Sequence, residues 1–139
     1  MAPPTTTGTI PAARTGQRTL TLPAGKREVA SARRFIEQVL GPEHPCADVA
    51  VLLTSELVAN AVVHSDSRHG GSVTVAVSRL SGWLQIEVTD AGSANSTPTV
   101  KRSASTCSGH GLFLVDTLAH EWGYCTSRGQ TTVWFSLLE

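Results

Sequence analysis

The chain has 139 residues, of which 40% are hydrophobic and 16% charged, and its formal net charge at pH 7 is zero. This length suits a single domain with its own core, and the balanced charge gives no support for nucleic acid or an anionic membrane as the main partner. No apolar run is long enough for a membrane span or a signal peptide, and three cysteines without metal-ligand spacing fit reduced thiols, so we expect a cytoplasmic protein.

The N-terminal part of the chain divides into a tail and the beginning of a domain. Residues 1–17 are rich in Thr, Pro, Ala and Gly, which predicts a disordered tail before a domain over residues 18–139. Arg18–Leu22 alternates like a short strand and is followed by a proline. Ala24–Leu40 has apolar residues at helical spacing, and Gly41–Pro42 ends this helix.

A second helix opens at Pro45 and Asp48 and stops near Ser65–Ser67. It is apolar on nearly all sides, except for one polar seam of residues spaced four apart, namely Glu56, Asn60 and His64. No Lys or Arg lies three or four residues from Glu56, so an intrahelical ion pair does not explain it. The seam is expected to find partners inside the protein, to line a cavity, or to reach solvent through a gap in the packing.

Two alternating runs, Ser72–Leu80 and Trp83–Asp90, are joined by a short link and predict a β-hairpin. The segment from Ala91 to Ser108 follows. It is rich in Ser, Thr and Ala and has no periodicity. A loop of this length inside a domain is usually functional or mobile.

The last third of the chain predicts a helix followed by two strands. The helix begins at Gly109, and the strands are Glu121–Ser127 and Thr131–Leu138 around an Arg128–Gly129 turn. The order β-α-α-β-β-loop-α-β-β, with strands in adjacent hairpins and helices on one face, predicts an α+β two-layer sandwich. The tryptophans on these strands, including Trp122, are expected to pack in the core or on the sheet.

Three features could carry chemistry together. An amide such as Asn60 can give an oxygen to Mg²⁺, and a neighbouring carboxylate, Glu56, can orient or deprotonate a group attacking a phosphate. Asp90, at a strand end, can accept a hydrogen bond from a purine amino group, although such an Asp often only ends a strand. Glycines at a helix start, Gly109 and Gly111, let backbone N–H groups approach an anion, although many such pairs are only turns.

The ordered set ELVANAVVH, EVTDAGSANSTP, GHGLFLVDTLAHEWGY and GQTTVWFSL resembles the GHKL, or Bergerat-fold, ATPase superfamily. Within it, the chain is most similar to small stand-alone bacterial ATP-binding proteins related to anti-sigma-factor serine kinases. The resemblance covers about residues 18–138. It implies a mostly antiparallel mixed sheet covered on one face by three helices, with ATP and Mg²⁺ as the bound groups.

The resemblance also implies roles for the matching residues of the first two boxes. Asn60 would hold Mg²⁺ between the phosphates, and Glu56 would be the catalytic base. Asp90 would recognise the adenine amino group, and Gly92 would allow close approach to the base. His64 matches a position that the family often fills with His, and we assign it no chemical step.

The remaining boxes imply further nucleotide-binding positions. The loop and the GHGL box after it would wrap the phosphates as a lid, with binding residues Gly109, His110, Gly111 and Leu112. In the final strand, Thr132 matches the family threonine that helps to hold adenine through its hydroxyl. Thr131 is the alternative if the register slips by one residue.

These roles predict an ATP·Mg-binding regulator, a serine/threonine kinase of the anti-sigma-factor type. By the resemblance, it would phosphorylate a small antagonist protein and control a sigma factor by partner switching, with a homodimer as the implied assembly. A non-catalytic ATP-binding module that only sequesters a partner is the main alternative. Simple ATP hydrolysis coupled to a change of shape is the third.

Overall fold

The computed structural model describes residues 17–25, 27–64, 71–80, 82–90, 107–127 and 130–139. The tail expected at residues 1–17 therefore lies outside the described residues except for Gln17, and so does most of the expected loop after Asp90. Within the described residues the elements are, in order, β1 (Arg18–Pro23), α1 (Glu28–Leu40), α2 (Ala47–His64), β2 (Ser72–Leu80), β3 (Trp83–Asp90), α3 (Cys107–Leu118), β4 (Glu121–Ser127) and β5 (Gln130–Leu138).

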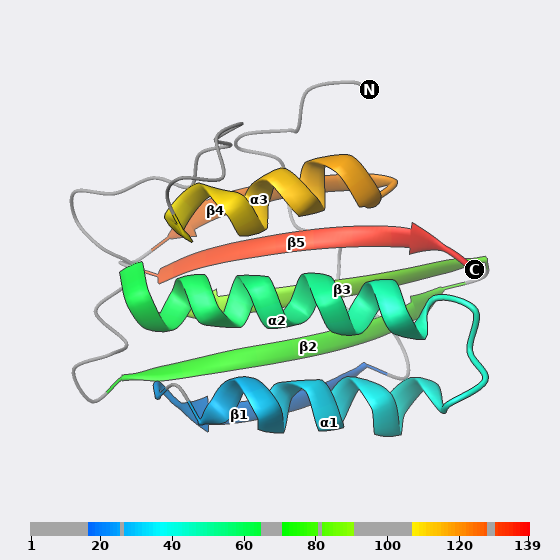
Figure 1. Cartoon of the computed structure of the whole chain (residues 1–139), viewed down its shortest axis with the longest axis horizontal. Coiled ribbons are helices and arrows are strands. Elements are labelled where there is room, and N and C mark those ends of the chain that lie inside the picture. The colour runs from blue at the N-terminus through cyan, green and yellow to red at the C-terminus, as the bar shows by residue number, and fades with distance from the viewer. Residues whose placement is uncertain (1–16, 26, 65–70, 81, 91–106, 128–129) are drawn as a thin grey trace.

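The strands form one five-stranded sheet in the order β1-β2-β3-β5-β4. The three helices lie side by side on one face of it, with α2 between α1 and α3 (Figure 1). This confirms the predicted α+β two-layer sandwich. Each of the four strand pairings is antiparallel, so the described sheet is antiparallel throughout and not mixed.

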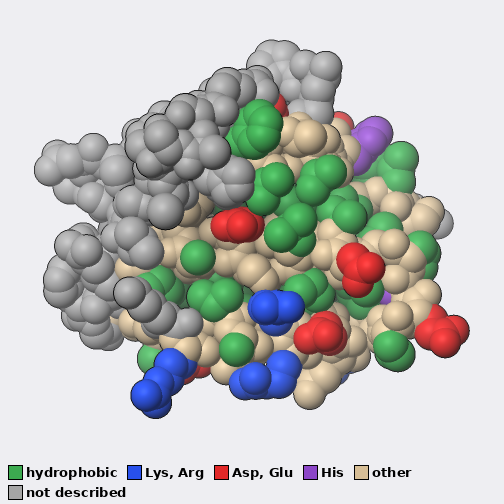
Figure 2. All heavy atoms as spheres, in the orientation of Figure 1, with side chains coloured by type: hydrophobic (Ala, Val, Ile, Leu, Met, Phe, Trp, Pro, Cys, Tyr) green, Lys and Arg blue, Asp and Glu red, His purple; other side chains and the backbone are tan. Residues whose placement is uncertain are grey.

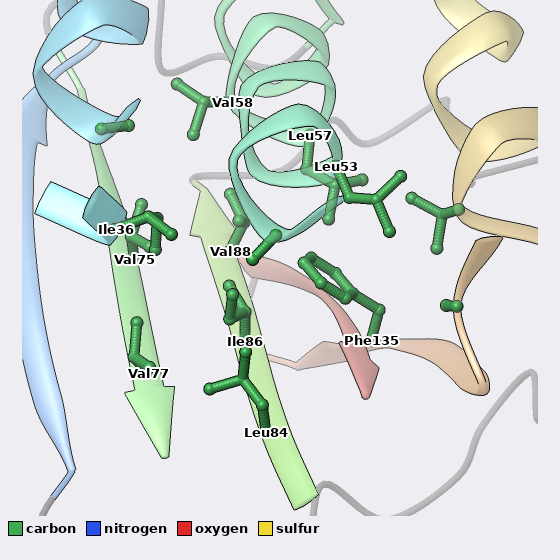
Figure 3. Packing of buried hydrophobic residues seen from close by; sticks show 14 of the residues in the cluster. Ile36, Leu53, Leu57, Val58, Val75, Val77, Leu84, Ile86, Val88 and Phe135 are labelled. Carbon is green, nitrogen blue, oxygen red and sulfur yellow. The ribbon is translucent and has the colours of Figure 1, made fainter. Parts of the chain in front are cut away.

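The core lies between the sheet and the helices. Alternation along β3 turns Leu84, Ile86 and Val88 towards the helices, where each is at most 2% exposed. Phe135 on β5 lies opposite Ile86 and is completely buried. Figure 3 shows these side chains beneath α2, together with Leu53 and Leu57 from that helix. Burying this continuous apolar layer holds α2 above the middle of the sheet.

The helix ends differ from the sequence expectation by a few residues. α1 begins at Glu28 and not at Ala24, because the Ala24 N–H still bonds the Gly71 carbonyl beside the β1–β2 pair. α1 ends as predicted at Gly41, whose φ of 87° requires glycine and whose N–H donates to the Glu37 carbonyl. No helix among the described residues is long and apolar enough to cross a membrane.

Candidate functional site

The polar seam of α2 lies at the edge of its buried face. Eight described residues of the helix are buried: Ala47, Ala50, Leu53, Thr54, Leu57, Val58, Ala61 and Val62. Glu56 and Asn60 are half-buried, and Leu52 is 40% exposed on the outer side. The helix is therefore not enclosed on all sides as its composition suggested, and the seam reaches the surface. His64 ends the helix, and its side chain lies outside the described residues.

Glu56 and Asn60, four residues apart, lie about 40° apart around the axis of α2. On the α1 side, α2 borders a groove whose lining includes Asp48, Val51, Ser55 and Glu56. Five residues at about 100° each place Asn60 about 140° around the helix from Ser55. Since α1 and α3 lie on opposite sides of α2, Asn60 belongs to the flank that faces α3 (Figure 1).

Asp90 ends β3 on the helix-covered face of the sheet. It is two residues beyond Val88, and alternation places both side chains on the same face. The residue directly opposite Asp90 on β5 is Thr131, which is 6% exposed. An acidic acceptor and a hydroxyl thus form a cross-strand pair beneath the helices.

Thr132, the threonine assigned to adenine from the sequence, lies on the opposite face of the sheet from Asp90. Its Cα partner is Thr89, and the two hydroxyl groups are 2.8 Å apart in a hydrogen bond. The side chains of consecutive strand residues point to opposite faces, so Thr132 and Asp90 cannot share a site on one face. The register favours the alternative, Thr131.

The GHGL box lies in the first turns of α3. This helix begins at Cys107, two residues before the expected start at Gly109. The first backbone N–H groups of a helix have no intrahelical acceptor and favour an anion. Gly92 and the side chains of His110 and Leu112 lie outside the described residues, so their expected roles stay predictions.

The predicted pieces gather at one end of the molecule. Figure 1 places the C-terminal end of α2, the first turn of α3 and the start of β5 on the same side. β3 runs antiparallel to β5, so Asp90 is also at this end. α2 packs against both α3 and β3. The described residues contain no group of three or more His, Cys, Asp or Glu side chains able to hold a metal ion.

Comparison with known proteins identifies the family. Residues 22–137 match the family described as the histidine kinase-like ATPase domain. The chain belongs to this family. The match runs from the end of β1 to the end of β5 and includes every position assigned from the four sequence boxes. The predicted resemblance is thereby confirmed for the domain as a whole, while the roles of single residues stay predictions.

Eleven chains of solved structures are similar to this histidine kinase-like ATPase domain. One is the crystal structure of the RsbU and RsbW domains of Rv1364c from Mycobacterium tuberculosis, with a TM-score of 0.66 and 24% sequence identity. The similarity covers 91% of this chain and 33% of that chain, so this domain spans about a third of its length. At this identity the likeness shows a shared fold. No curated protein matches the chain.

Sequence reasoning missed two things about the site. It did not show which of Thr131 and Thr132 shares a face with Asp90, because that depends on the register between β3 and β5. It also missed the groove beside Glu56, which depends on how α1 and α2 pack. In the sequence, the groove could have been suspected only from the residues of α2 that face outward, such as Asp48 and Leu52.

Proposed function

We propose that this histidine kinase-like ATPase domain binds ATP with Mg²⁺ and transfers the γ-phosphoryl group to a serine or threonine of a protein partner. The observation that carries the proposal is the Asp90–Thr131 pair on the helix-covered face. It lies at the end of the sheet where the α3 first turn and the α2 C-terminal end also lie (Figure 1). Family membership supports a nucleotide as the occupant.

The Asp90–Thr131 pair suits an adenine base. An ionised carboxylate accepts hydrogen bonds only, which matches the exocyclic amino group of adenine. The Thr131 hydroxyl can donate to a ring nitrogen or accept from a bridging water. Both groups project from a rigid strand pair, so their spacing is fixed before the base binds.

The phosphates and the metal ion would lie closer to the helices. Asn60 offers a neutral amide oxygen from the flank of α2 that faces α3, and the first N–H groups of α3 favour negative charge. Mg²⁺ keeps several waters and takes few protein ligands, so one amide together with phosphate oxygens is a suitable set. When bound, the ion neutralises charge on the phosphates.

Glu56 is the proposed general base. Its carboxylate would accept the proton of the attacking hydroxyl as the hydroxyl oxygen bonds to the γ-phosphorus and ADP leaves. The half-buried side chain lines an open groove, so a partner protein as well as a nucleotide can reach it. A fully buried carboxylate could not be reached by both the partner protein and the nucleotide.

The family resemblance supports a regulatory role. A phosphoryl group adds close to two negative charges to the partner and can disrupt the interface that the hydroxyl form makes. The partner would be a sigma factor, its antagonist, or both in turn. A domain named RsbW in the similar structure agrees with such a role without establishing it for this chain.

Radiolabelled ATP separates the proposed activities. The purified chain is assayed for nucleotide binding, released phosphate and label passed to co-purifying proteins. We expect Glu56→Gln to keep nucleotide affinity and to lose transfer by a factor of about 10² to 10⁴. Asn60→Ala should weaken the Mg²⁺-dependent part of binding, and Glu121→Gln, at an exposed carboxylate on β4, is the control.

Each outcome decides between the candidates. Binding without any transfer or hydrolysis identifies a sequestering module. Phosphate release without labelled protein identifies a hydrolase. If Glu56→Gln transfers phosphate as fast as the parent chain, Glu56 is not the base. If the chain binds no nucleotide, the whole proposed site is wrong.

A further inference from the structure

A groove runs along the outer side of the helix layer, between α1 and α2. Its volume is about 870 Å³, and it is lined by both helices and by the connection between them. Glu56 is among its lining residues and Asn60 is not, so Glu56 is the residue that the groove shares with the proposed nucleotide site. Every residue that lines it belongs to the described part of the chain.

The lining combines negative charge with apolar surface. Three carboxylates, Glu37, Asp48 and Glu56, face a single guanidinium, that of Arg33. Leu52 also lines the groove and is 40% exposed, so it offers apolar surface to a partner. Figure 2 views this side of the molecule and shows apolar side chains reaching the surface between charged ones.

We propose that this groove docks an amphipathic helix of a partner protein, with apolar side chains against Leu52 and Lys or Arg side chains beside the carboxylates. The excess of negative charge selects a basic segment and disfavours nucleic acid and anionic lipid. Two adjacent helices form a trough in which a third can pack at a distance of about 8–10 Å. The volume corresponds to about two turns of a helix of about 10 Å diameter.

The position of Glu56 gives the groove a role in the reaction, and this step rests on the proposed function. A helix lying along the groove would end beside the candidate base. A serine or threonine at the end of that helix, or just beyond it, could then present its hydroxyl to the carboxylate. The groove would thus select the protein substrate, while the Asp90–Thr131 pair selects the nucleotide.

Two designed peptides test the charge preference without nucleotide. One is a fluorescein-labelled amphipathic peptide of about 14 residues with leucine on one face and lysine on the other, and its twin carries glutamate in place of lysine. Fluorescence anisotropy measures their affinity for the purified chain. We expect the basic peptide to bind at least about 10-fold more tightly than the acidic one at low salt. Equal affinities would overturn the proposal.

Matched variants locate the binding surface. The double variant Glu37→Gln/Asp48→Asn should weaken the basic peptide by about 3- to 10-fold, since each rim charge contributes modestly. Glu28→Gln/Glu121→Gln removes the same charge outside the groove and should change affinity by less than about 2-fold. An equal loss in both double variants means that only net charge matters, and the proposal fails.

A second pair tests the apolar contact. Leu52 and Leu118 are 40% and 41% exposed, on α2 and α3 respectively, so truncating either removes a similar amount of surface. Leu52→Ala should weaken the basic peptide by about 3- to 10-fold and Leu118→Ala by less than about 2-fold. The reverse result would place the peptide elsewhere. Backbone amide shifts from α1 and α2 in the bound chain provide an independent check.

The failure of this proposal can be told apart from that of the proposed function. Peptide binding is measured without ATP, and ATP binding is measured without peptide. A chain that binds the basic peptide at the groove but transfers no phosphate keeps the docking surface and loses the kinase. A chain that transfers phosphate but does not distinguish the two peptides keeps the kinase and loses the docking surface.

Discussion

Asp90 lies directly opposite Thr131 in the antiparallel ladder between β3 and β5, on the face that the helices cover. The next pair along, Thr89 and Thr132, occupies the other face and is joined by a hydrogen bond of 2.8 Å. Two neighbouring threonines with the same chemistry therefore have different environments. Thr131 lies at the proposed adenine site, where its hydroxyl is also 3.5 Å from that of Thr126, and Thr132 bonds Thr89 on the other face.

The roles of Thr131 and Thr132 can be distinguished by making the same substitution at each position. Thr131→Val removes the hydroxyl from the proposed site, and we expect ATP affinity to fall by about 2- to 12-fold, the value of one hydrogen bond. Thr132→Val breaks the bond to Thr89, so we expect the free energy of unfolding to fall by about 0.5–1.5 kcal/mol with ATP affinity unchanged. Calorimetry with ATP and urea denaturation measure the two quantities. Loss of affinity in Thr132→Val alone would favour Thr132 as the adenine-binding threonine.

Asp90 should determine the preference for the base. Asn has the same shape but is neutral and can donate a hydrogen bond as well as accept one. Hydrogen bonds to charged groups contribute more than neutral ones, so Asp90→Asn should lower ATP affinity by about 10- to 100-fold. It should also narrow the preference for ATP over inosine triphosphate, which carries a carbonyl in place of the amino group.

The control for Asp90→Asn is Asp48→Asn, the same chemical change at an exposed position on α2. Asp48→Asn should change the affinities for ATP and for inosine triphosphate by less than about 2-fold. An exposed charge outside the nucleotide site is largely screened by salt. If Asp90→Asn keeps the parental preference for ATP over inosine triphosphate, Asp90 does not contact the amino group.

The sequence predicted the strands more sharply than the helix ends or the choice of threonine. The bounds of β2, β3 and β4 agree with the expected ones. In β2 and β3 this is because alternating runs with β-branched residues stop abruptly. The start of α3 was placed two residues late because Cys107 and Ser108 add nothing to the apolar periodicity. A one-residue slip exchanges Thr131 and Thr132 between faces, and only the register with β3 decides it.

Thr54 allows a measurement of how much an unsatisfied buried hydroxyl lowers the stability of the core. It is completely buried on α2, and its hydroxyl oxygen has no hydrogen-bond partner within the part of the chain that the structure describes. An unsatisfied buried hydroxyl costs about 1–3 kcal/mol, and valine has almost the same shape and a similar helix propensity. We therefore expect Thr54→Val to raise the free energy of unfolding by about 1 kcal/mol, measured by urea denaturation.

The control for Thr54→Val is Thr117→Val on α3. The Thr117 hydroxyl is exposed and donates to the Phe113 carbonyl at 2.8 Å. Its removal should leave stability unchanged within about 0.5 kcal/mol, as for most surface substitutions. A loss of stability in Thr54→Val would show that the hydroxyl has a partner, for example a buried water.

Cys46 links the α1–α2 connection to the C-terminal end of β5. Its thiol donates to the Leu138 carbonyl at 3.1 Å. Burial raises the pKa of the Cys46 thiol, and the negative charge of Glu139 raises it further. Less thiolate is therefore present at mildly alkaline pH than for a free cysteine, whose pKa is about 8.5. We expect iodoacetamide to alkylate Cys46 slowly, with a pH–rate midpoint above that value.

Glu139→Gln should move this midpoint to lower pH, because it removes the charge that opposes ionisation. Looser packing alone would raise the limiting rate without moving the midpoint, so a pH–rate profile by peptide mass spectrometry distinguishes the two effects. Glu43→Gln, at an exposed residue of the same connection, is the control and should leave the midpoint in place. Since the folded pKa is raised, the thiol's contribution to stability is complete below the unfolded pKa. It is lost as the pH rises through the folded value. An unmoved midpoint in Glu139→Gln would leave burial as the whole cause.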